Sequence, residues 1–391
     1  MKKNFLVMAL IAMGMPLTFS ACSDNDDNNE TEEAANIDVT TENVQKWAKY
    51  MEVVSQKLLA DSETLLADWQ TSYNGGRSYA ALFKAHDGAS GFNSATDCIG
   101  QIIDGCADIA NEVGSAKIGD PYDLYISGKR TEALYAVESW YSWHSIDDYS
   151  NNILSVRNAL FGTRNGSKNE NSIIKFVEYR NEALAANVEN AVNAAYDAIQ
   201  AIPAPLRNNI VCEQTEAAMA ACADLEEVLT KELKPFFTNM TVDEDDEKEL
   251  DAIVVNYVDN VVLPTYRDLV AKNTALYTAV RTFQAAPSNA GFEACAAAWI
   301  AAREPWETSE GFLFGPVADK GLDPNMDSWP LDQDGIVKIM NSGNYSALDW
   351  SGEFDEESES IADAQSLRGY HTLEFLIFKD GKARTITALG E

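Results

Sequence analysis

Basic residues and long apolar runs are scarce in this chain. Its 391 residues include 29 lysines and arginines against 62 aspartates and glutamates, which gives a formal net charge of −33. Nucleic acids are bound mainly by lysine and arginine at phosphates, so this balance excludes a nucleic-acid partner. The negative charge attracts cations, but solubility outside the cell explains it equally well, so by itself it favours no ligand. After the first residues, no segment approaches the roughly 20 consecutive apolar residues of a membrane-spanning helix. The body of the chain is therefore predicted to fold outside the bilayer.

Cysteines are also few, and their spacing limits cross-links. After Cys22 the sequence contains Cys98, Cys106, Cys212, Cys222 and Cys295, without a C-x-x-C pair. On one helix, Cys98 and Cys106 would lie about 12 Å apart at a rise of about 1.5 Å per residue, which is too far for a disulfide. We expect mostly buried free thiols, with a bridge between Cys212 and Cys222 as the alternative.

The N-terminus has the pattern of an export signal. Two lysines precede the uncharged apolar run Phe5–Met15, and small residues follow. The segment Phe19–Cys22 resembles a lipoprotein lipobox, although leucine is commoner at its first position. We therefore expect residues 1–21 to be removed and Cys22 to carry lipid that holds the protein to a membrane. The alternative is an ordinary secretory signal that ends near a cysteine by coincidence.

An acidic stretch follows the predicted lipid site. The segment Ser23–Glu30 contains no large apolar residue, so it cannot bury enough surface to fold. Residues 22–39 are predicted to be a tether. Acidic residues directly after the cysteine resemble the export signals of lipoproteins displayed on some Gram-negative outer membranes. The expected location is the cell envelope, as an outer-membrane lipoprotein, with surface display as a further expectation.

Helical periodicity dominates the remainder of the chain. Apolar residues recur at spacings of three and four, which is typical of amphipathic helices. The clearest apolar stripes are Val44–Trp69, Ile99–Val113 and Ile173–Ile199. Alternating strands bounded by glycine are scarce. The prediction is an all-α fold of two packed helical bundles, at about residues 40–165 and 166–391.

Irregular structure is predicted where glycine, proline and aspartate gather. These stretches are Gly75–Gly76, Gly114–Gly128, Gly162–Asn169 and Phe314–Trp329. The last is long enough either to cover a functional site or to be a surface excursion, and the sequence leaves both open.

One segment near the C-terminus combines charge with aromatic rings. Trp299, Arg303, Trp306 and Glu310 have offsets of 0, 4, 7 and 11, which is one face of an α-helix. A core face holds arginine and glutamate only when they are paired, so we expect this face to meet another polar group. The alternative is a purely structural pair under aromatic cover. Pro305 either kinks this helix or starts a second one.

A second segment contains His371 and Glu374, three residues apart. On a helix these side chains point the same way and could form a metal-ligand or acid–base pair, whereas on a strand they point apart. Lys379–Lys382 is a suitable hairpin turn, with Ala383–Ile386 as the returning strand. The residues alone therefore leave a helix and a small C-terminal hairpin as alternatives.

These two segments resemble a known family. Gly369–Leu376 is similar to the G-x-H-x-x-E-F-L motif of the imelysin family, also called peptidase family M75. Trp299–Pro316 resembles its second signature, in which an aromatic and an arginine precede an aromatic, a glutamate and F-x-F-x-G-P. Trp329–Asp332 resembles its N-x-W-P-L-D segment, with Asp327 in place of asparagine. The resemblance implies an all-α domain over residues 40–391, with the motif residues between two helical bundles.

The order of the motifs differs from that of the better-known members. There the signatures come early, whereas here they end the chain, so the order resembles a circular permutation. Lys49–Trp69 resembles the helix that follows G-x-H-x-x-E in those members. Glu138–Asp148 resembles, more loosely, their E-H-S-x-F-S-D-N region. This implies that Glu138, Ser142 and Asp148 belong to the same site.

The resemblance and the acidic charge together favour a metal-binding protein of the cell envelope. The family includes iron-regulated envelope proteins, so iron is the first candidate and zinc the second. The expected metal ligands are His371, Glu374 and Glu310. Arg303 is expected to orient a carboxylate or to bind an anion carried with the metal.

Two other functions stay open at this point. The family name implies a metallopeptidase, which needs three protein ligands, an open position and a general base. The H-E-x-x-H motif is absent, however, and the histidines are limited to His86, His144 and His371. The other alternative is a non-catalytic surface module for peptide or glycan, in which His371 and Glu374 form a satisfied buried pair.

Overall fold

The computed structural model describes residues 37–387, so the predicted signal peptide, Cys22 and most of the tether lie outside the described residues. Helices dominate this range, and the all-α prediction is confirmed. The strands are β1 (Val39–Thr40), β2 (Phe378–Lys379), β3 (Lys382–Ala383) and β4 (Ile386–Thr387). No helix between residues 37 and 387 has both the length and the apolarity of a membrane span.

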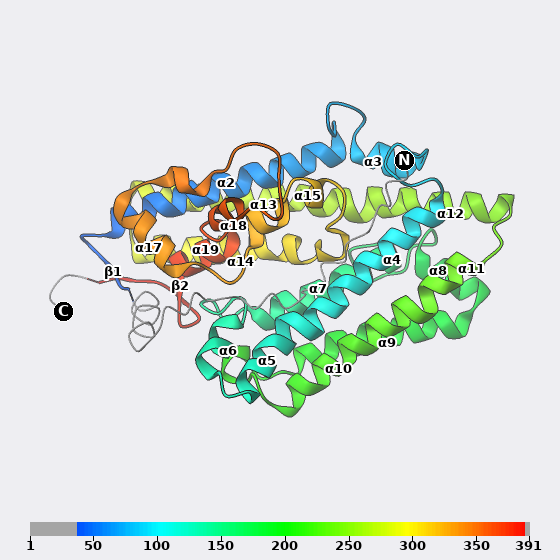
Figure 1. The fold of residues 1–391 in the computed structure, drawn as a ribbon, viewed down its shortest axis with the longest axis horizontal. Coiled ribbons are helices and arrows are strands. Elements are labelled where there is room, and N and C mark those ends of the chain that lie inside the picture. Colours follow the sequence, from blue (N-terminus) through cyan, green and yellow to red (C-terminus); the bar gives the residue numbers. More distant parts are fainter. Residues whose placement is uncertain (1–36, 388–391) are drawn as a thin grey trace.

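The first bundle is built around a central pair of long antiparallel helices. Its members are α2 (Val44–Gln70), α13 (Leu263–Ala285), α14 (Asn289–Glu307) and α19 (Gly369–Ile377). Helix α13 packs against both α2 and α14, and α19 packs against α2 and α14 (Figure 1). The apolar stripe of α2 from Val44 to Trp69 is buried, as its periodicity predicts.

The second bundle lies beside the first. Its members are α4 (Ala95–Glu112), α7 (Ser145–Phe161), α8 (Ile173–Arg180), α9 (Glu182–Gln200) and α10 (Glu213–Val228). Helices α4, α7, α9 and α10 pack against one another, and α8 packs on α9 (Figure 1).

The predicted division at residues 165 and 166 does not follow this packing. Helix α2 comes before it but packs on α13 and α19, which come after it. Helices α9 and α10 come after it but pack on α7 and α4. An apolar stripe shows that a helix has a buried face without showing which helix covers that face.

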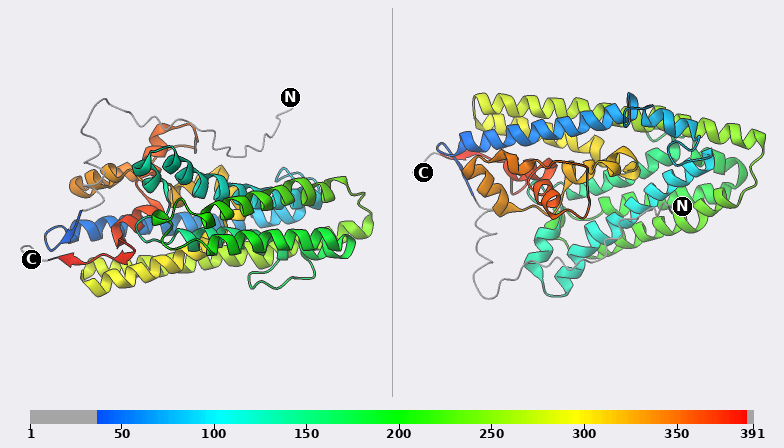
Figure 2. Two further views of the ribbon diagram at one scale, coloured as in Figure 1. Left: turned by 90° about the horizontal axis from the view of Figure 1, so that it is seen from below. Right: turned by 45° about the horizontal axis from the view of Figure 1, so that its top comes forward.

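Three helical rods contain a π-helical segment. The first is α4–η1–α5, with η1 at Val113–Ile118 and α5 at Gly119–Ile126. The second is α10–η3–α11, with η3 at Leu229–Leu233 and α11 at Lys234–Asn239. The third is α12–η4–α13, with α12 at Glu244–Tyr257 and η4 at Val258–Val262. Figure 2 shows the last rod running along the molecule. Its α12 part packs on α4 and its α13 part packs on α2, so this rod joins the two bundles.

Shorter elements connect these helices. They are α3 (Tyr79–Ala85), α6 (Arg130–Ala136), η2 (Leu206–Asn208), η5 (Glu310–Phe312), α15 (Pro316–Asp319), α16 (Leu322–Asp327), α17 (Gln333–Ser342), η6 (Tyr345–Leu348) and α18 (Glu359–Gln365). Helices α15 and α16 fall in the stretch predicted to be irregular from Phe314 to Trp329, so that prediction is wrong for most of the stretch.

The irregular structure predicted from Gly114 to Gly128 is also wrong, because η1 and α5 occupy it. Its first glycine serves close packing rather than a turn. A Cβ on Gly114 would lie 2.8 Å from the Cβ of Cys222 and 3.3 Å from the carbonyl oxygen of Met219. Glycine is therefore needed where η1 meets α10.

The C-terminal segment resolves the choice left open for His371. Residues Gly369–Ile377 form helix α19, and a short hairpin of β2 and β3 follows it, so both predicted elements are present in succession. Strand β4 pairs in parallel with β1, which brings the two ends of the described chain together. The cysteines that the structure describes are all free, so the alternative of a bridge between Cys212 and Cys222 is wrong.

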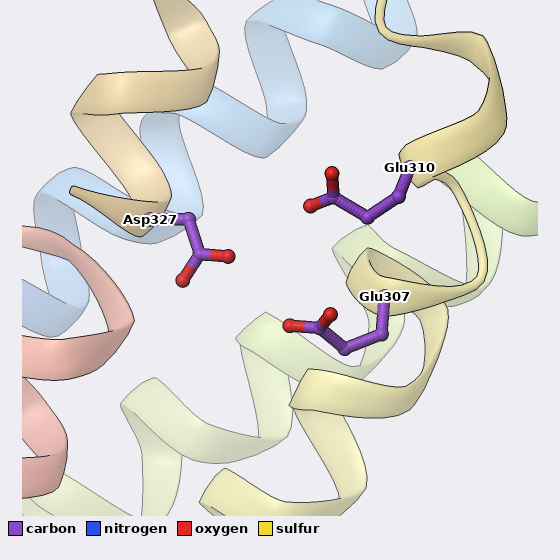
Figure 3. Close-up of side chains that lie close together, drawn as sticks. All are labelled: Glu307, Glu310 and Asp327. Atoms are coloured by element: carbon purple, nitrogen blue, oxygen red, sulfur yellow. The ribbon is translucent and has the colours of Figure 1, made fainter. Parts of the chain in front are cut away.

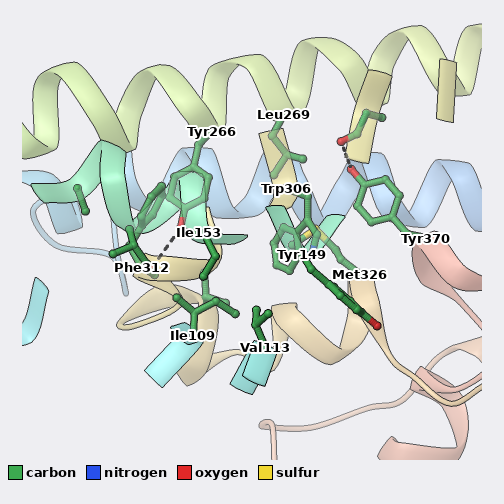
Figure 4. Close-up of a cluster of buried hydrophobic side chains, with 14 of the residues drawn as sticks. Ile109, Val113, Tyr149, Ile153, Tyr266, Leu269, Trp306, Phe312, Met326 and Tyr370 are labelled. Carbon is green, nitrogen blue, oxygen red and sulfur yellow. Dashed lines mark hydrogen bonds between the residues drawn. The ribbon is translucent and has the colours of Figure 1, made fainter. Parts of the chain in front are cut away.

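A buried apolar cluster fills the space between the bundles (Figure 4). It brings Ile109 and Val113 from the α4 rod and Ile153 from α7 against Tyr266 and Leu269 of α13. Apolar burial is the main stabilising contribution to folding, so this cluster fixes how the bundles sit. Polar residues at this interface are thus held in a rigid setting.

Candidate functional site

Helix α19 carries His371 and Glu374 into the interior. Gly369 begins it with φ at +89°, and a Cβ there would lie 2.4 Å from the carbonyl oxygen of Met326 in α16. Only glycine tolerates both the backbone conformation and the close approach. His371 and Glu374 are three residues apart on α19, so their side chains share one face of the helix. Every residue of α19 is buried, so this face lies inside the protein.

Both carboxylate oxygens of Glu374 are occupied. Oε2 lies 3.0 Å from Nδ1 of His371. Oε1 accepts hydrogen bonds from the backbone N–H of Tyr141 at 3.0 Å, and from the backbone N–H and hydroxyl of Ser142 at 2.7 Å each. A carboxylate with these donors acts as an acceptor, which assigns a proton to Nδ1 of His371. Glu374 therefore orients His371.

The other ring nitrogen of His371 faces Asp327. Nε2 lies 3.2 Å from Oδ1 of Asp327. It is buried and makes no hydrogen bond to any residue in the described range. In the neutral ring with its proton on Nδ1, Nε2 presents a lone pair to this carboxylate oxygen. Two lone pairs at this distance repel, so the geometry calls for a proton or a metal ion between them.

Asp327 is held in its ionised form. Its Oδ2 accepts a hydrogen bond from the indole N–H of Trp306 at 2.7 Å, and its Oδ1 accepts one from Arg303. Burial alone would raise the pKa of Asp327. The charge of Arg303 outweighs burial and lowers this pKa to about 2.

Arg303 lies at the centre of a buried charge network. It forms ion pairs with Asp148, at 3.1 Å between Nη2 and Oδ2, and with Glu307 and Asp327. Burial opposes the charged form, but these carboxylates raise the pKa of Arg303 well above its usual value. Protein carboxylates therefore occupy both terminal nitrogens of Arg303, and its expected role in binding an anion stays a prediction.

Three carboxylates converge beside this network. Glu307, Glu310 and Asp327 turn toward one another, and one oxygen of each lies within 4.8 Å of the others (Figure 3). No residue of the described chain donates a hydrogen bond to Glu310. Burial raises the pKa of Glu310 well above its usual value, although Lys117 opposes this. Such a group is stabilised by a proton or by a bound cation.

Two of these carboxylates, Glu310 and Asp327, border a pocket of about 210 Å³ between the bundles. Its acidic lining residues are Glu112, Glu138, Glu310, Asp323 and Asp327. The side chain of Glu112 is 52% exposed, so the pocket meets solvent on that side. Trp329 lies at the edge, with its ring centroid 4.8 Å from that of His371, and its N–H donates to the carbonyl of Ala136 at 3.1 Å.

Lys117 is the one basic residue among the described residues that line the pocket. Its ammonium lies 2.9 and 3.2 Å from the two carboxylate oxygens of Glu138 and 3.6 Å from Glu112. Burial would lower the pKa of Lys117, but Glu138 and Glu112 raise it well above its usual value. The pocket therefore contains a permanent positive charge of its own.

Residues 24–232 and 262–390 match the model of the imelysin family, peptidase M75. The chain belongs to the imelysin family. It is similar to an imelysin peptidase from Bacteroides ovatus, whose crystal structure is 51% identical and superposes with a TM-score of 0.87. That likeness covers 90% of this chain and 100% of the other. The family prediction is confirmed, and the circularly permuted order stays a prediction.

Two further matches carry an iron-regulated name. Iron-regulated protein A of Synechococcus elongatus is 35% identical over 125 residues, which cover 32% of this chain and 31% of that protein. The structure of an iron-regulated protein A precursor from Parabacteroides distasonis is 37% identical, with a TM-score of 0.42. That match covers 45% of this chain and 52% of the other. This chain thus spans about a third of the first relative and about half of the second.

Most residues of the two imelysin signatures meet at Asp327 or line the pocket. These are Arg303, Trp306, Glu310 and His371. Trp299 lies apart from the pocket, because its indole N–H donates to the carbonyl of Tyr370 at 2.9 Å and its ring packs on Phe378. Trp299 therefore belongs to the apolar core that packs behind the predicted site.

The prediction that Trp299, Arg303, Trp306 and Glu310 share one helical face is wrong at its C-terminal end. Helix α14 ends at Glu307 with Pro305 inside it, and Glu310 lies in the separate turn η5. The turn nevertheless directs Glu310 into the pocket.

The looser imelysin resemblance also led to residues at this site. Glu138 lines the pocket and binds its lysine. Ser142 donates two hydrogen bonds to Glu374. Asp148 pairs with Arg303 from the second bundle. The structure therefore brings all three residues to the interface that holds the signatures.

Several residues of the site were not predicted from the sequence. Glu307 carries a usable signal, because it lies four residues after Arg303 and so shares its helical face. Lys117 has no such signal in the sequence, since the direction of its side chain depends on the π-helical turn η1. Asp323 lies in a stretch that was predicted to be irregular. Asp327 was noted only as a departure from the family motif.

Proposed function

We propose that this chain binds one metal cation between its bundles, with iron as the first candidate and zinc as the second. The observation that carries the proposal is the lone pair of His371 Nε2, which faces Oδ1 of Asp327 at 3.2 Å. Two ligands bound at about 2.0–2.1 Å in tetrahedral geometry lie about 3.3–3.4 Å apart. A metal ion between these atoms would replace their repulsion with coordination.

The proposed ligands are His371, Asp327 and Glu310, with Glu307 within reach of the same centre. One imidazole with several carboxylates suits iron, manganese or zinc better than metals that prefer sulfur. Arg303 faces more carboxylates than its single charge can neutralise, which favours a further cation. In this arrangement Glu374 orients His371 from outside the ligand set, in contrast to its expected role as a ligand.

Metal titration of the purified protein tests this proposal. Protein stripped with chelator is titrated with iron(II) under anaerobic conditions and, separately, with zinc, and bound metal is measured by elemental analysis. We expect one ion per chain and thermal stabilisation that follows the metal concentration. His371→Ala should abolish this binding, and Glu374→Gln should weaken it by about 10–100-fold.

His86 offers a matched control. It is a half-buried histidine whose Nε2 lies 2.9 Å from Asp251, and it takes no part in the pocket. His86→Ala should retain full metal affinity. The proposal fails if the wild-type protein binds neither metal, or if His371→Ala binds as tightly as His86→Ala.

Metallopeptidase activity is the second candidate. It is favoured by the name of the Bacteroides ovatus structure and by Glu310, a pocket carboxyl group whose pKa burial raises, as suits a general base. Metal-loaded protein should then cleave members of a broad peptide library, and cleavage should stop with chelator and with Glu310→Gln. Absence of cleavage by metal-loaded protein removes this candidate.

The proposed address is the cell envelope, with the protein held to the outer membrane by lipid on Cys22. The support is the order of basic residues, apolar run and lipobox-like Phe19–Cys22 in the sequence. Cys22→Ser should release the protein from the membrane fraction. Unchanged membrane association of this variant would exclude lipid on Cys22 as the anchor.

A further inference from the structure

Glu374 is held by the segment that connects α6 to α7. We call residues 139–144 of this segment the Glu374 loop. Ser139 and Trp143, on either side of its two backbone donors to Glu374, have φ at +51° and +63°. Residues other than glycine seldom adopt this left-handed conformation, and such strain is found where a fold holds a functional group in place. The strain at both ends of the loop indicates that the loop has a positioning role.

One peptide unit of the Glu374 loop connects Arg207 with Glu374. The N–H of Tyr141 donates to Oε1 of Glu374 at 3.0 Å. The carbonyl of Trp140 belongs to the same peptide unit and accepts a hydrogen bond from Nη1 of Arg207 at 3.2 Å. Because a peptide unit is planar, the partner of its carbonyl also fixes the direction of its N–H. Arg207 therefore helps to aim this N–H at Glu374.

The next peptide unit is held by the C-terminal hairpin. The N–H of Ser142 donates to the same oxygen of Glu374 at 2.7 Å, and the carbonyl of Tyr141 in that unit accepts from the N–H of Gly381 at 2.9 Å. Gly381 lies in the turn between β2 and β3 with φ at +73°, and a Cβ there would lie 2.5 Å from the ring of Trp143. Only glycine allows the hairpin to come this close. Both peptide units that bind Glu374 are thus also held at their carbonyl groups.

Arg207 is placed by contacts with both the loop and the hairpin. It lies in η2, between α9 and α10, and its side chain is 14% exposed. Its guanidinium carbon lies 4.0 Å from the ring centroid of Trp140 and 5.2 Å from that of Trp143. Its Nη2 lies 3.4 Å from Oδ1 of Asp380 in the hairpin turn. A planar guanidinium can stack on an aromatic ring and donate hydrogen bonds from its edge at the same time, which suits arginine and not lysine.

We propose that Arg207 is a positioning residue for the metal site, because it fixes the peptide unit whose N–H holds Glu374 in place to orient His371. This inference rests on the proposed metal-binding function. The hydrogen bond from a charged guanidinium is stronger than one between neutral groups, and hydrogen bonds in a chain reinforce one another. Replacing a residue that orients a metal ligand from outside the ligand set typically changes metal affinity by about 10–100-fold. Since Arg207 acts through Glu374, we expect an effect at the lower end of this range.

Zinc affinity tests this inference. Arg207→Met keeps apolar contact with Trp140 but donates no hydrogen bond to its carbonyl. Arg180→Met is the matched control, because Arg180 makes the same kinds of contact on α8, outside the pocket. Its guanidinium carbon lies 3.6 Å from the ring centroid of Phe176, whose carbonyl it binds at 3.4 Å, and it pairs with Asp246 at 2.6 Å. At a temperature where circular dichroism shows both variants folded, the Kd for zinc should rise about tenfold in Arg207→Met and stay unchanged in Arg180→Met.

Two further measurements separate positioning from a general loss of stability. In the metal-free protein, hydrogen–deuterium exchange at the amides of Tyr141 and Ser142 should speed up in Arg207→Met and not in Arg180→Met. In a Glu374→Ala background, Arg207→Met should cause no further loss of zinc affinity, because effects that act through one group do not add. A residue that only stabilises the fold would have the same effect with or without Glu374.

Each result has a defined meaning. An unchanged Kd for zinc in folded Arg207→Met, or an equal loss of affinity in the Glu374→Ala background, would overturn the role of Arg207 and leave the proposed function intact. A wild-type protein that binds neither iron nor zinc would overturn the proposed function, and the exchange of the Tyr141 and Ser142 amides would then decide on Arg207 alone. If Arg207→Met is unfolded, Arg207→Lys takes its place, because lysine keeps the charge without the planar group that stacks on Trp140. A wild-type Kd in Arg207→Lys would overturn the inference, and a raised one supports it.

Discussion

Arg303 and Lys117 are two buried cations that pair with carboxylates at this site, and they differ in how far water reaches their partners. Around Arg303, the side chains of Asp148, Glu307 and Asp327 are exposed by 1%, 0% and 3%. Around Lys117, the side chain of Glu138 is 12% exposed and that of Glu112 is 52% exposed. We call these two regions the Arg303 side and the Lys117 side.

This difference in exposure predicts that losing a charge has different consequences on the two sides. On the Arg303 side, water cannot replace a lost partner, so every charge depends on the others. On the Lys117 side, solvent at Glu112 can compensate for part of a change. The comparison teaches that burial, more than the number of charges, separates the part whose charges depend on one another from the part that water can screen.

Arg303→Met should have the largest effect and tests the Arg303 side directly. The substitution keeps apolar bulk but leaves Asp148, Glu307 and Asp327 buried without their cation. Removing one partner of a buried ion pair typically costs about 3–5 kcal/mol. We expect the free energy of unfolding, measured by urea denaturation at pH 7, to fall by about this amount.

The control for this prediction is Arg77→Met. Arg77 pairs with Asp87 at 2.8 Å, but the two side chains are 46% and 47% exposed. An exposed pair contributes about 0–1 kcal/mol, so the control should remain close to the wild type. Equal losses in the two variants would contradict the view that burial sets the importance of the Arg303 network.

Much of the fold could be predicted from periodicity, because a buried helical face needs apolar residues at regular spacing. The stripe from Val44 to Trp69 matches α2 almost residue for residue. The partner of α2 could not be predicted in this way, since α13 lies about 200 residues later and no local pattern links the two. Gly114 misled the prediction because close packing and turns both require glycine.

The site was predictable where a motif and helical spacing agreed. Arg303 and His371 stand in recognisable motifs, and both lie at the centre of the network. The role of Glu374 was not predictable, because its oxygens are occupied by donors from Tyr141 and Ser142, far away in the sequence. The place of Lys117 in the site was not predictable for a different reason, since a π-helical turn changes the direction in which its side chain points.

The free energy of unfolding of the metal-free protein, measured against pH, should reveal the protonation of Asp323 on the Lys117 side. Burial, helped by the charge of Asp327, raises the pKa of Asp323 to about 7, against about 3.9 in the unfolded chain. Between pH 4 and pH 7 the folded protein then binds more protons at this group than the unfolded chain does. Stability from this group is therefore lost as the pH rises through that window, and the penalty is complete above pH 7.

Asp323→Asn should remove this penalty. We expect the metal-free variant to be about 1–2 kcal/mol more stable than the wild type at pH 8, with solvent at the pocket mouth limiting the gain. The difference should shrink as the pH falls and vanish below about pH 3, where the wild-type group is protonated in both states. Asp224→Asn, at an exposed position of α10, is the control. A difference that does not change with pH would contradict the buried, proton-binding state of Asp323.

Trp329→Phe should have the smallest effect on stability, because Trp329 touches both sides without carrying charge. Its ring packs on His371, and its N–H donates to the carbonyl of Ala136, two residues before Glu138. The half-buried hydrogen bond contributes about 1 kcal/mol, and water can replace part of it. We expect a loss of this size in urea denaturation.

The same variant separates a covering role of Trp329 from an orienting one. If Trp329 only covers the pocket, Trp329→Phe should speed both uptake and chelator-driven release of metal in stopped-flow experiments, with little change in Kd. Trp350→Phe is the control, because Trp350 donates only a long hydrogen bond of 3.4 Å to Asn325. A tenfold or larger rise in Kd for Trp329→Phe alone would show instead that its ring holds His371 in position. The orientation of His371 would then depend on contacts with the Lys117 side as well as on Glu374.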